Sequence, residues 1–350
     1  MILCPAQLEP IFSPRPWGSL SLAPFFPEKT NLPEPLGEAW MSALDCQFAG
    51  GPFAGKKLGE AWREMPAEWR GTSISRDAPF PLLVKFIFTE QKLSVQVHPD
   101  DDYAARHEKN AGGRGKTEMW YVVNAHPGSE VMVGLQPAAS KECFRRSIQD
   151  GTAENLLTRV PVVPGDAIYV PAGTIHTIGS GLVLCEIQEY SDLTYRVYDY
   201  NRRDAQGKSR ELHIEKALDV IRFGEQRGGK IQRVQTKHGD LSETYLAACR
   251  YFVTVKWEFS RRVAASTSRE HFDLLIFLDG CGSFHWGHQQ AEYAPMQVWL
   301  LPAALGAYEL APSASTSAFR AYVPDNLSDF ARQLVAEGIS QENLSRILHP

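Results

Sequence analysis

The sequence predicts a mostly β protein, a barrel or sandwich with a few added helices. Strand-like runs bounded by glycine and proline recur along most of the chain, which is typical of this class. Some of these runs alternate apolar and polar residues, so that successive side chains lie on opposite faces of a strand. The chain has 350 residues, 43% of them hydrophobic, which is enough to form one large core or two modest ones.

The run 93–98 shows the alternation clearly. Ser94, Gln96 and His98 share one face, and the intervening apolar residues form the other. The strand candidates before residue 200 are 82–88, 93–98, 118–124, 130–134, 167–170, 182–188 and 194–200.

Three helices are expected in the same part of the chain. Ser140 can cap a helix over Lys141–Gln149, and Glu154–Arg159 is a second short candidate. The segment His213–Phe223 is an amphipathic helix candidate because its apolar residues recur at helical spacing. These residues are Ile214, Ala217, Leu218 and Ile221. Gly224 and the pair at 228–229 then interrupt the pattern, which predicts a linker over about 224–240.

The second half resembles a degenerate copy of the first. Strand candidates resume at 251–259, 272–278, 298–301 and 318–323. Residues 164–176 can be aligned with 295–307, with the same spacing between two prolines, but Ala307 stands where the first copy has His176. We therefore expect a metal-binding domain over 1–235, a second domain without that site over 236–325, and a charged helical tail over 326–350.

Composition excludes several classes of function. A net charge of −5 and a pI near 6.1 do not suit a nucleic-acid-binding protein, and no run is long enough for a membrane span. The six cysteines are scattered, without a C-x-x-C pair, which argues against a disulfide framework and favours a reducing compartment. The N-terminus lacks the features of a signal peptide. These observations predict a cytoplasmic protein; they do not indicate an oligomeric state.

Four side chains together predict a metal site. Gln96 and His98 share a strand face, Glu118 opens an apolar strand, and His176 follows a sharp turn. Each alone has an ordinary structural interpretation, a hydrogen-bonded histidine or a surface charge. Burying all of them without a partner would cost on the order of several kcal/mol, whereas one cation would satisfy them together. Carboxylate and imidazole ligands suit zinc best.

These residues lie in segments that resemble the class I mannose-6-phosphate isomerases, zinc-dependent enzymes of the cupin superfamily. The chain is similar in length to the compact bacterial members. The matching segments are Arg15–Gly18, Gly37–Trp40, Leu93–Asp100, Gly115–Tyr121, Pro171–His176 and Ser191–Tyr200. The resemblance implies two cupin-like β-barrel or jelly-roll domains and a sugar-phosphate substrate.

The resemblance also implies a set of site residues. One Zn²⁺ would be held by Gln96, His98, Glu118 and His176. The substrate would be surrounded by Trp17, Glu38, Ser94, Lys116, Glu186 and Arg196.

Local chemistry supports some of these roles. Lys116 shares a strand face with Glu118, which would place a cation beside the metal ligands. Glu186 interrupts an apolar strand, at a cost unless it has a role or forms a structural ion pair with Arg196. Arg196 and Arg202 suit a phosphate dianion, the alternative being a solvated surface.

The implied reaction interconverts mannose 6-phosphate and fructose 6-phosphate through a cis-enediol, with zinc as a Lewis acid. The candidates for proton transfer are Asp192, Lys116, Glu186 and a zinc-bound water, and the sequence does not choose among them. Two other functions compete: an iron-dependent cupin oxygenase, which Gln96 in a histidine's place disfavours, and a catalytically silent sugar-phosphate sensor.

Overall fold

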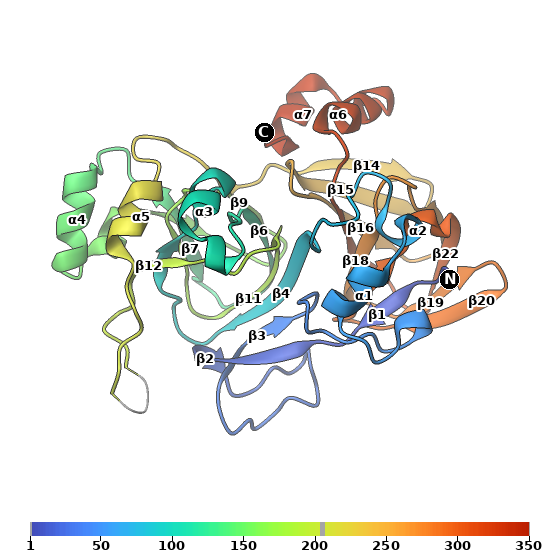
Figure 1. Ribbon diagram of the computed structural model, residues 1–350, viewed down its shortest axis with the longest axis horizontal. Coiled ribbons are helices and arrows are strands. Elements are labelled where there is room, and N and C mark those ends of the chain that lie inside the picture. Colours follow the sequence, from blue (N-terminus) through green and yellow to red (C-terminus); the bar gives the residue numbers. More distant parts are fainter. Residues whose placement is uncertain (1, 204–206, 350) are drawn as a thin grey trace.

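A computed structural model describes residues 2–203 and 207–349 (Figure 1). Strands make up 39% of the chain and helices 18%, so the prediction of a mostly β protein is confirmed. In the described part of the chain the strands form four sheets, two of seven strands, one of five and one of four. Within the described residues none of these sheets closes into a barrel; they are open sheets packed in pairs, the sandwich form that the sequence left as the alternative.

The first half of the chain builds one seven-stranded and one five-stranded sheet. The first, in spatial order, contains β13 (Gly229–Lys230), β9 (Ala167–Val170), β6 (Glu118–Ala125), β11 (Leu182–Glu189), β4 (Leu82–Thr89), β3 (Leu36–Trp40) and β2 (Ile11–Ser19). The second contains β12 (Tyr195–Tyr198), β5 (Val95–Val97), β10 (His176–Ile178), β7 (Glu130–Leu135) and β8 (Leu157–Pro161). Buried residues of both sheets form one core, which includes Trp120, Val133 and Ile178.

The second half builds the other pair of sheets. The larger contains β1 (Ala6–Leu8), β21 (Val298–Leu301), β18 (Asp273–Asp279), β23 (Thr316–Tyr322), β16 (Val253–Phe259), β15 (Leu241–Ala248) and β14 (Val234–His238). The smaller contains β17 (Val263–Ser266), β22 (Ala307–Pro312), β19 (Gly282–Trp286) and β20 (Gln289–Tyr293). Phe277, Phe284 and Trp299 lie in the core between them.

Helices connect and cover the sheets. The α-helices are α1 (Leu58–Glu64), α2 (Ala67–Arg70), α3 (Asp101–His107), α4 (Lys141–Gln149), α5 (Ile214–Val220), α6 (Leu327–Ala336) and α7 (Gln341–Ile347). Short 3-10 turns are η1 (Gly51–Phe53), η2 (Lys109–Ala111), η3 (Ala153–Leu156) and η4 (Ala303–Leu305). The helices expected at 141–149 and 213–223 are confirmed, with the predicted Ser140 cap accepting from the Cys143 amide. No helix of the described residues is both long and apolar enough to cross a membrane.

The two halves share a core. Alternation along β4, β6 and β11 sends one set of side chains toward the first-half core and the other set toward the second half. In this shared core Phe80 stacks on Phe272, with ring centroids 5.3 Å apart, and Tyr121 meets Phe319 edge to face. The N-terminal strand β1 also pairs with β21 of the second half. Figure 1 shows this crossing, with the blue β1 among orange elements.

Two local predictions were wrong. The helix expected over Glu154–Arg159 is a short turn followed by β8, because Val160 pairs with Val131 and tertiary pairing overrides local helix propensity. The linker expected over 224–240 contains β13 and β14, which belong to different sheets. The segment that connects the two halves is therefore short, from residue 231 to 233. The charged tail forms two helices, α6 and α7, separated near Gly338.

Candidate active site

The five-stranded sheet aligns three predicted site residues across adjacent strands. Gln96 on β5 is registered with His176 on β10 on one side and with Arg196 on β12 on the other. The Gln96 Nε2 and His176 Nε2 atoms lie 3.4 Å apart. On the same face as Gln96, the Ser94 hydroxyl accepts a hydrogen bond from Arg196 Nε at 3.2 Å. The alternation predicted from the sequence therefore places two possible metal ligands and a possible phosphate-binding arginine on one face of the sheet.

The seven-stranded sheet supplies the facing set. Glu186 on β11 is registered with Lys85 on β4 and with Trp120 on β6. Glu118, two residues before Trp120, points to the same face. The Trp120 indole N–H donates to Glu186 Oε2 at 3.0 Å, so this carboxylate is held in place from the core side.

His98, Glu118 and His176 form a cluster with the spacing of metal ligands. One ligand atom from each lies within 4.8 Å of the others, and all three residues are at most 1% exposed. Glu118 Oε1 is 3.7 Å from His98 Nε2 and 3.4 Å from His176 Nε2. Buried Glu118 Oε1 has no hydrogen-bond partner among the described residues. A divalent cation at this point would satisfy it together with both imidazoles.

The two histidines are oriented for that role. His98 Nδ1 lies 2.7 Å from the Leu193 carbonyl oxygen, and His176 Nδ1 lies 2.9 Å from that of Thr174. A carbonyl only accepts, so each Nδ1 carries the proton and each Nε2 presents its lone pair toward Glu118. Burial and the neighbouring Lys116 charge lower the pKa of His98; burial lowers that of His176 to about 3. Both rings are therefore neutral, the form that binds metal.

Two buried lysines balance the acidic groups. Lys116 Nζ contacts Glu118 Oε2 closely and lies 3.5 Å from Glu186 Oε1. Lys85 Nζ lies 2.7 Å from Asp192 Oδ1 and 3.9 Å from Glu186 Oε1. Burial opposes ionisation of Glu118, but the Lys116 charge holds its pKa well below the usual range. Burial and the Glu118 charge raise the pKa of Glu186 to about 7.

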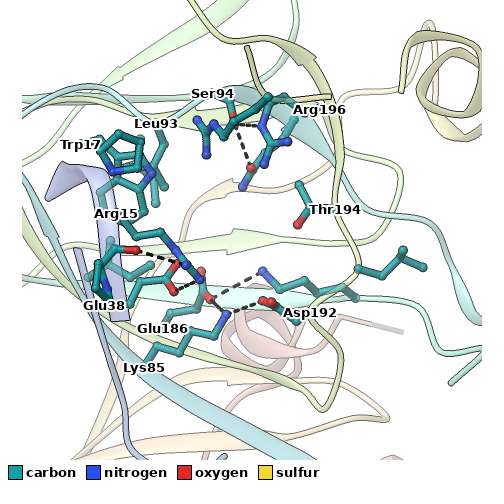
Figure 2. Close-up of a pocket in the computed structure, with 18 of the residues that line it drawn as sticks. Arg15, Trp17, Glu38, Lys85, Leu93, Ser94, Glu186, Asp192, Thr194 and Arg196 are labelled. Atoms are coloured by element: carbon teal, nitrogen blue, oxygen red, sulfur yellow. Dashed lines mark hydrogen bonds and ion pairs between the residues drawn. The ribbon is translucent and has the colours of Figure 1, made fainter. Parts of the chain in front are cut away.

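The alternative ion pair between Glu186 and Arg196 is not formed. Glu186 is bound by Lys85, Lys116 and Trp120, whereas Arg196 donates to Ser94 and to the Glu211 carbonyl oxygen. Figure 2 shows the separation, with Glu186, Lys85 and Asp192 on one side of the cavity and Arg196 with Ser94 on the other.

A cavity of about 670 Å³ opens between these two sides. Eight of the predicted site residues line it: Trp17, Glu38, Ser94, Gln96, Lys116, Glu186, Asp192 and Arg196. The metal-type cluster is buried behind them and adjoins the cavity through Gln96, beside His176, and Lys116, beside Glu118. The cavity therefore places the cluster next to a polar chamber the size of a small ligand site.

Arg202 does not line the cavity. Its guanidinium instead bonds the carboxylate of Asp199 and the Lys92 carbonyl oxygen, at 2.6 and 2.7 Å. Arg210 lines the wall in its place and bonds the same Asp199 carboxylate. Residue spacing alone could not show this, because Arg210 reaches the wall through a loop rather than a strand.

Five polar residues of the cavity wall were not predicted from the sequence: Arg15, Lys85, Thr194, Arg210 and His213. Lys85 carried a usable signal, because it interrupts the apolar strand β4 as Glu186 interrupts β11. Arg15 lies inside the segment that includes Trp17, and its guanidinium donates to Glu38 Oε2 at 2.7 Å. Arg210 and His213 follow no strand pattern.

The second half carries a different group at the corresponding place. Glu118 pairs with Val170 just before Pro171, and Asp273 pairs with Leu301 just before Pro302. Asp273 is fully buried; its Oδ2 accepts from Arg320 Nε at 2.9 Å, and its Oδ1 lies 3.2 Å from His271 Nδ1. A cation of the chain itself thus neutralises the carboxylate that aligns with Glu118.

Comparisons with known proteins point to one enzyme family. The catalytic domain of type I phosphomannose isomerases matches residues 7–144. Two Bacillus subtilis (strain 168) proteins, the probable mannose-6-phosphate isomerase GmuF and the mannose-6-phosphate isomerase ManA, are each 37% identical over 87% of this chain and at least 95% of their own lengths. A Streptococcus mutans mannose-6-phosphate isomerase is 38% identical over 73% of this chain and 79% of its own length.

Solved structures give the same result. The crystal structure of mannose 6-phosphate isomerase from Bacillus subtilis superimposes with a TM-score of 0.82 at 30% identity, covering 91% of this chain and 99% of that one. A putative mannosephosphate isomerase from Archaeoglobus fulgidus shares the fold, with a TM-score of 0.70 at 18% identity over 92% of this chain and 99% of that one. The chain belongs to the type I phosphomannose isomerase (mannose-6-phosphate isomerase) family and is an isomerase.

Proposed function

We propose that this protein is a zinc-dependent aldose–ketose isomerase that interconverts D-mannose 6-phosphate and D-fructose 6-phosphate through a cis-enediol. The observation that carries the proposal is the buried His98–Glu118–His176 cluster beside a polar cavity whose wall bears Arg196. The relatives named mannose-6-phosphate isomerase support the choice of substrate.

We assign the metal to His98, Glu118 and His176, with the Gln96 side-chain oxygen completing the set after rotation of its amide. Two neutral imidazoles, a carboxylate and an amide suit zinc. Zinc would supply a Lewis acid that stabilises negative charge on the oxygens of the enediol. Lys116, beside Glu118, adds a second positive charge at the same end of the cavity.

The reaction moves protons between neighbouring carbons. In the forward direction the C2 proton leaves the open-chain aldose, a proton is delivered to C1, and the hydroxyl proton passes from O2 to O1. Glu186 suits this work because a carboxyl with a pKa of about 7 exists in both forms at neutral pH. Trp120 fixes one of its oxygens, and Lys116 and Lys85 flank the other. Asp192, bound to Lys85, is the alternative proton carrier.

The opposite wall is suited to the phosphate. Arg196 and Arg210 line it, and Ser94 holds the Arg196 guanidinium by its Nε. Burial and the nearby Arg210 charge lower the pKa of Arg196, but a guanidinium remains charged at neutral pH. We assign Trp17 and Glu38 to the rim that contacts the sugar. Arg196 pairs in register with Gln96 on the neighbouring strand, so its charge is placed to stabilise either the phosphate or the enediolate.

Replacement of Arg196 by alanine tests whether this residue acts in the reaction without binding the metal. We expect turnover of mannose 6-phosphate to fall by about 100-fold or more, as when one preorganised donor is lost from an active site. Zinc content should stay near that of the unmodified protein, because Arg196 contacts none of the three clustered ligands. Steady-state kinetics and metal analysis of the same preparation give both numbers. An unchanged rate would refute a role for Arg196 in the reaction.

A coupled assay tests the function itself. Purified protein should convert mannose 6-phosphate to fructose 6-phosphate and leave free mannose untouched, because the arginine wall requires a phosphate. In deuterated water the product should carry deuterium at C1, since the proton exchanges during an enediol pathway. Absence of fructose 6-phosphate formation by zinc-loaded protein would overturn the proposal.

We also propose that the two pairs of sheets are cupin-like domains, a catalytic one over 1–235 and a second without the metal site over 236–325, followed by the tail 326–350. Glu118 and Asp273 pair with equivalent residues of the two halves, which supports a duplication. Strand β1 is an exception to the boundary, because it lies in the first range of the sequence but pairs with β21 of the second half. All six cysteines are free, which supports our assignment to the reducing cytoplasm.

A further inference from the structure

We propose that Asp199 is a positioning residue that holds Arg210 against the cavity wall and thereby sets the affinity for the phosphate of the substrate. The inference rests on the proposed function and goes beyond it, because Asp199 does not itself line the cavity. It explains how a loop residue with no strand pattern becomes part of the phosphate wall.

Asp199 binds two guanidinium groups at once. Arg210 forms a bidentate pair with it, Nε to Oδ2 at 2.7 Å and Nη2 to Oδ1 at 2.6 Å. Arg202 approaches Oδ1 from its own Nε and Nη2, at 3.1 and 2.6 Å. Asp199 is only 6% exposed, so these charge-assisted bonds are shielded from water. Its pKa is held below the usual range by the two arginines, although burial acts in the opposite direction.

Asp199 is itself fixed to the five-stranded sheet. Asp199 directly follows β12, the strand that carries Arg196. The chain returns at His213, whose amide donates to the Arg196 carbonyl oxygen at 2.7 Å. Arg202 is tied in turn to the Lys92 carbonyl oxygen at 2.7 Å, at the start of the segment that leads into β5. Asp199 therefore connects Arg210 to the framework that holds Arg196.

Arg210 needs such an anchor because its neighbour carries the same charge. Both guanidiniums line the same cavity, and the charge of Arg210, after burial, lowers the pKa of Arg196, so the two groups repel each other. Without a counter-ion, a side chain that is 30% exposed would turn toward solvent. The negative charge of Asp199 offsets this repulsion. The carboxylate binds the Nε and Nη2 atoms of Arg210, and the Arg210 Nη1 atom is not directed at it.

The test is the D199N variant, which keeps the size of the side chain and removes its charge. We expect KM for mannose 6-phosphate to rise about tenfold, as for the loss of one charge-assisted contact, and kcat to stay within about threefold. The inhibition constant of inorganic phosphate should rise by the same factor, and so should its dissociation constant measured by calorimetry on the zinc-loaded protein. R210Q should reproduce these shifts, and the D199N/R210Q double variant should be no worse than R210Q.

Asp166 offers a matched control. It is a buried carboxylate that pairs with two cations, Lys230 at 2.7 Å and Arg233 at 3.5 Å, but it lies outside the cavity. D166N should leave KM and phosphate binding unchanged.

Three outcomes decide the matter. A rise in KM shared by D199N and R210Q, with D166N unaffected, supports the proposal. Unchanged KM and phosphate affinity in either D199N or R210Q overturn it, and R210Q alone decides if D199N does not fold. An unmodified protein that binds phosphate but does not isomerise mannose 6-phosphate contradicts the proposed function instead, and the calorimetric comparison still tests Asp199.

Discussion

Glu118 joins the metal-type cluster to the cavity through its two oxygens. One oxygen faces the imidazoles of His98 and His176, and the other contacts Lys116. Its carboxylate thus neutralises a buried lysine and, by our proposal, part of the charge of a zinc ion. Loss of its charge should disturb both functions together.

We therefore predict that Glu118→Gln loses zinc and activity together. Mutation of a group that only orients the ligands typically lowers metal affinity or activity by about 10–100-fold. Substitution of a ligand itself should lower both by more. The buried Lys116 ammonium would also lose the nearer of its two carboxylates and keep only Glu186, which should destabilise the protein by at most the about 3–5 kcal/mol typical of a broken buried pair. Zinc stoichiometry, isomerase rate and urea unfolding check the three effects. Full zinc occupancy in the variant would contradict our assignment of Glu118 as a ligand.

Glu189 gives a pH-dependent prediction at the same scale. Burial, and next the charge of Asp101, raise its pKa from 4.5 to about 8, and its Oε1 accepts from the Thr117 amide at 2.6 Å. The unfolded chain ionises this group near pH 4.5 and the folded protein near pH 8. Its contribution to stability is therefore complete below pH 4.5 and is lost as pH rises toward 8.

Glu189→Gln should remove this loss while keeping an oxygen for the Thr117 amide. We expect the variant to exceed the unmodified protein in free energy of unfolding at pH 8 by at least about 1 kcal/mol, and by less at pH 5. Urea unfolding at the two pH values measures the difference. An equal gap at both would show that Glu189 does not titrate in this window.

At this scale the sequence indicated the metal-type side chains because each interrupts an otherwise apolar strand or follows a turn. Lys85 obeys the same rule and was predictable on that ground. Arg210 was not, because its position depends on a loop and on the long-range pair with Asp199. Arg202 is not among the residues that line the cavity, and charge and proximity in sequence do not reveal which of two arginines turns toward it.

At the scale of elements, strands with strong alternation or a continuous apolar run were predictable, including β4, β6, β9 and β11. Their period decides which face is buried. Which strands pair with one another was harder to predict from the sequence. The segment Leu157–Pro161 became a strand because β7 offered an edge, and β13 and β14 formed inside an expected linker. The short strand β1, bounded by Pro5 and Pro10, was not predicted, since three residues carry no period.

Strand β1 leads to a stability prediction. Leu8 is fully buried and pairs with Val298 on β21, whereas Ile2 is 67% exposed. Leu8→Ala should lower the free energy of unfolding by about 2–5 kcal/mol, the range for truncating a buried leucine. Ile2→Ala should change it by no more than about 0.5 kcal/mol. Urea unfolding compares the two, with KM unchanged in both. A Leu8 variant as stable as the Ile2 variant would show that β1 contributes little.

At the scale of the whole molecule, the shared core couples the two halves. Phe272 of the second half is fully buried against Phe80 and Trp62 of the first. Unfolding of one half would expose apolar surface of the other. The metal site should therefore survive only as long as the second half is folded.

Phe272→Ala tests this coupling. The truncation should cost about 3–5 kcal/mol and lower the urea concentration at which activity and zinc are lost, although Phe272 lies outside the cavity. Intrinsic fluorescence and residual activity should change at the same urea concentration. Separate transitions, with activity unaffected by the substitution, would show that the halves unfold independently.

We propose that the His98–Glu118–His176 cluster holds the zinc required for isomerisation of mannose 6-phosphate. The decisive experiment removes the metal with a chelator, measures fructose 6-phosphate formation, and titrates zinc back. We predict loss of activity on chelation and recovery that saturates at one zinc per chain. Full activity in metal-free protein, or recovery with iron accompanied by oxygen consumption, would refute this role of the cluster.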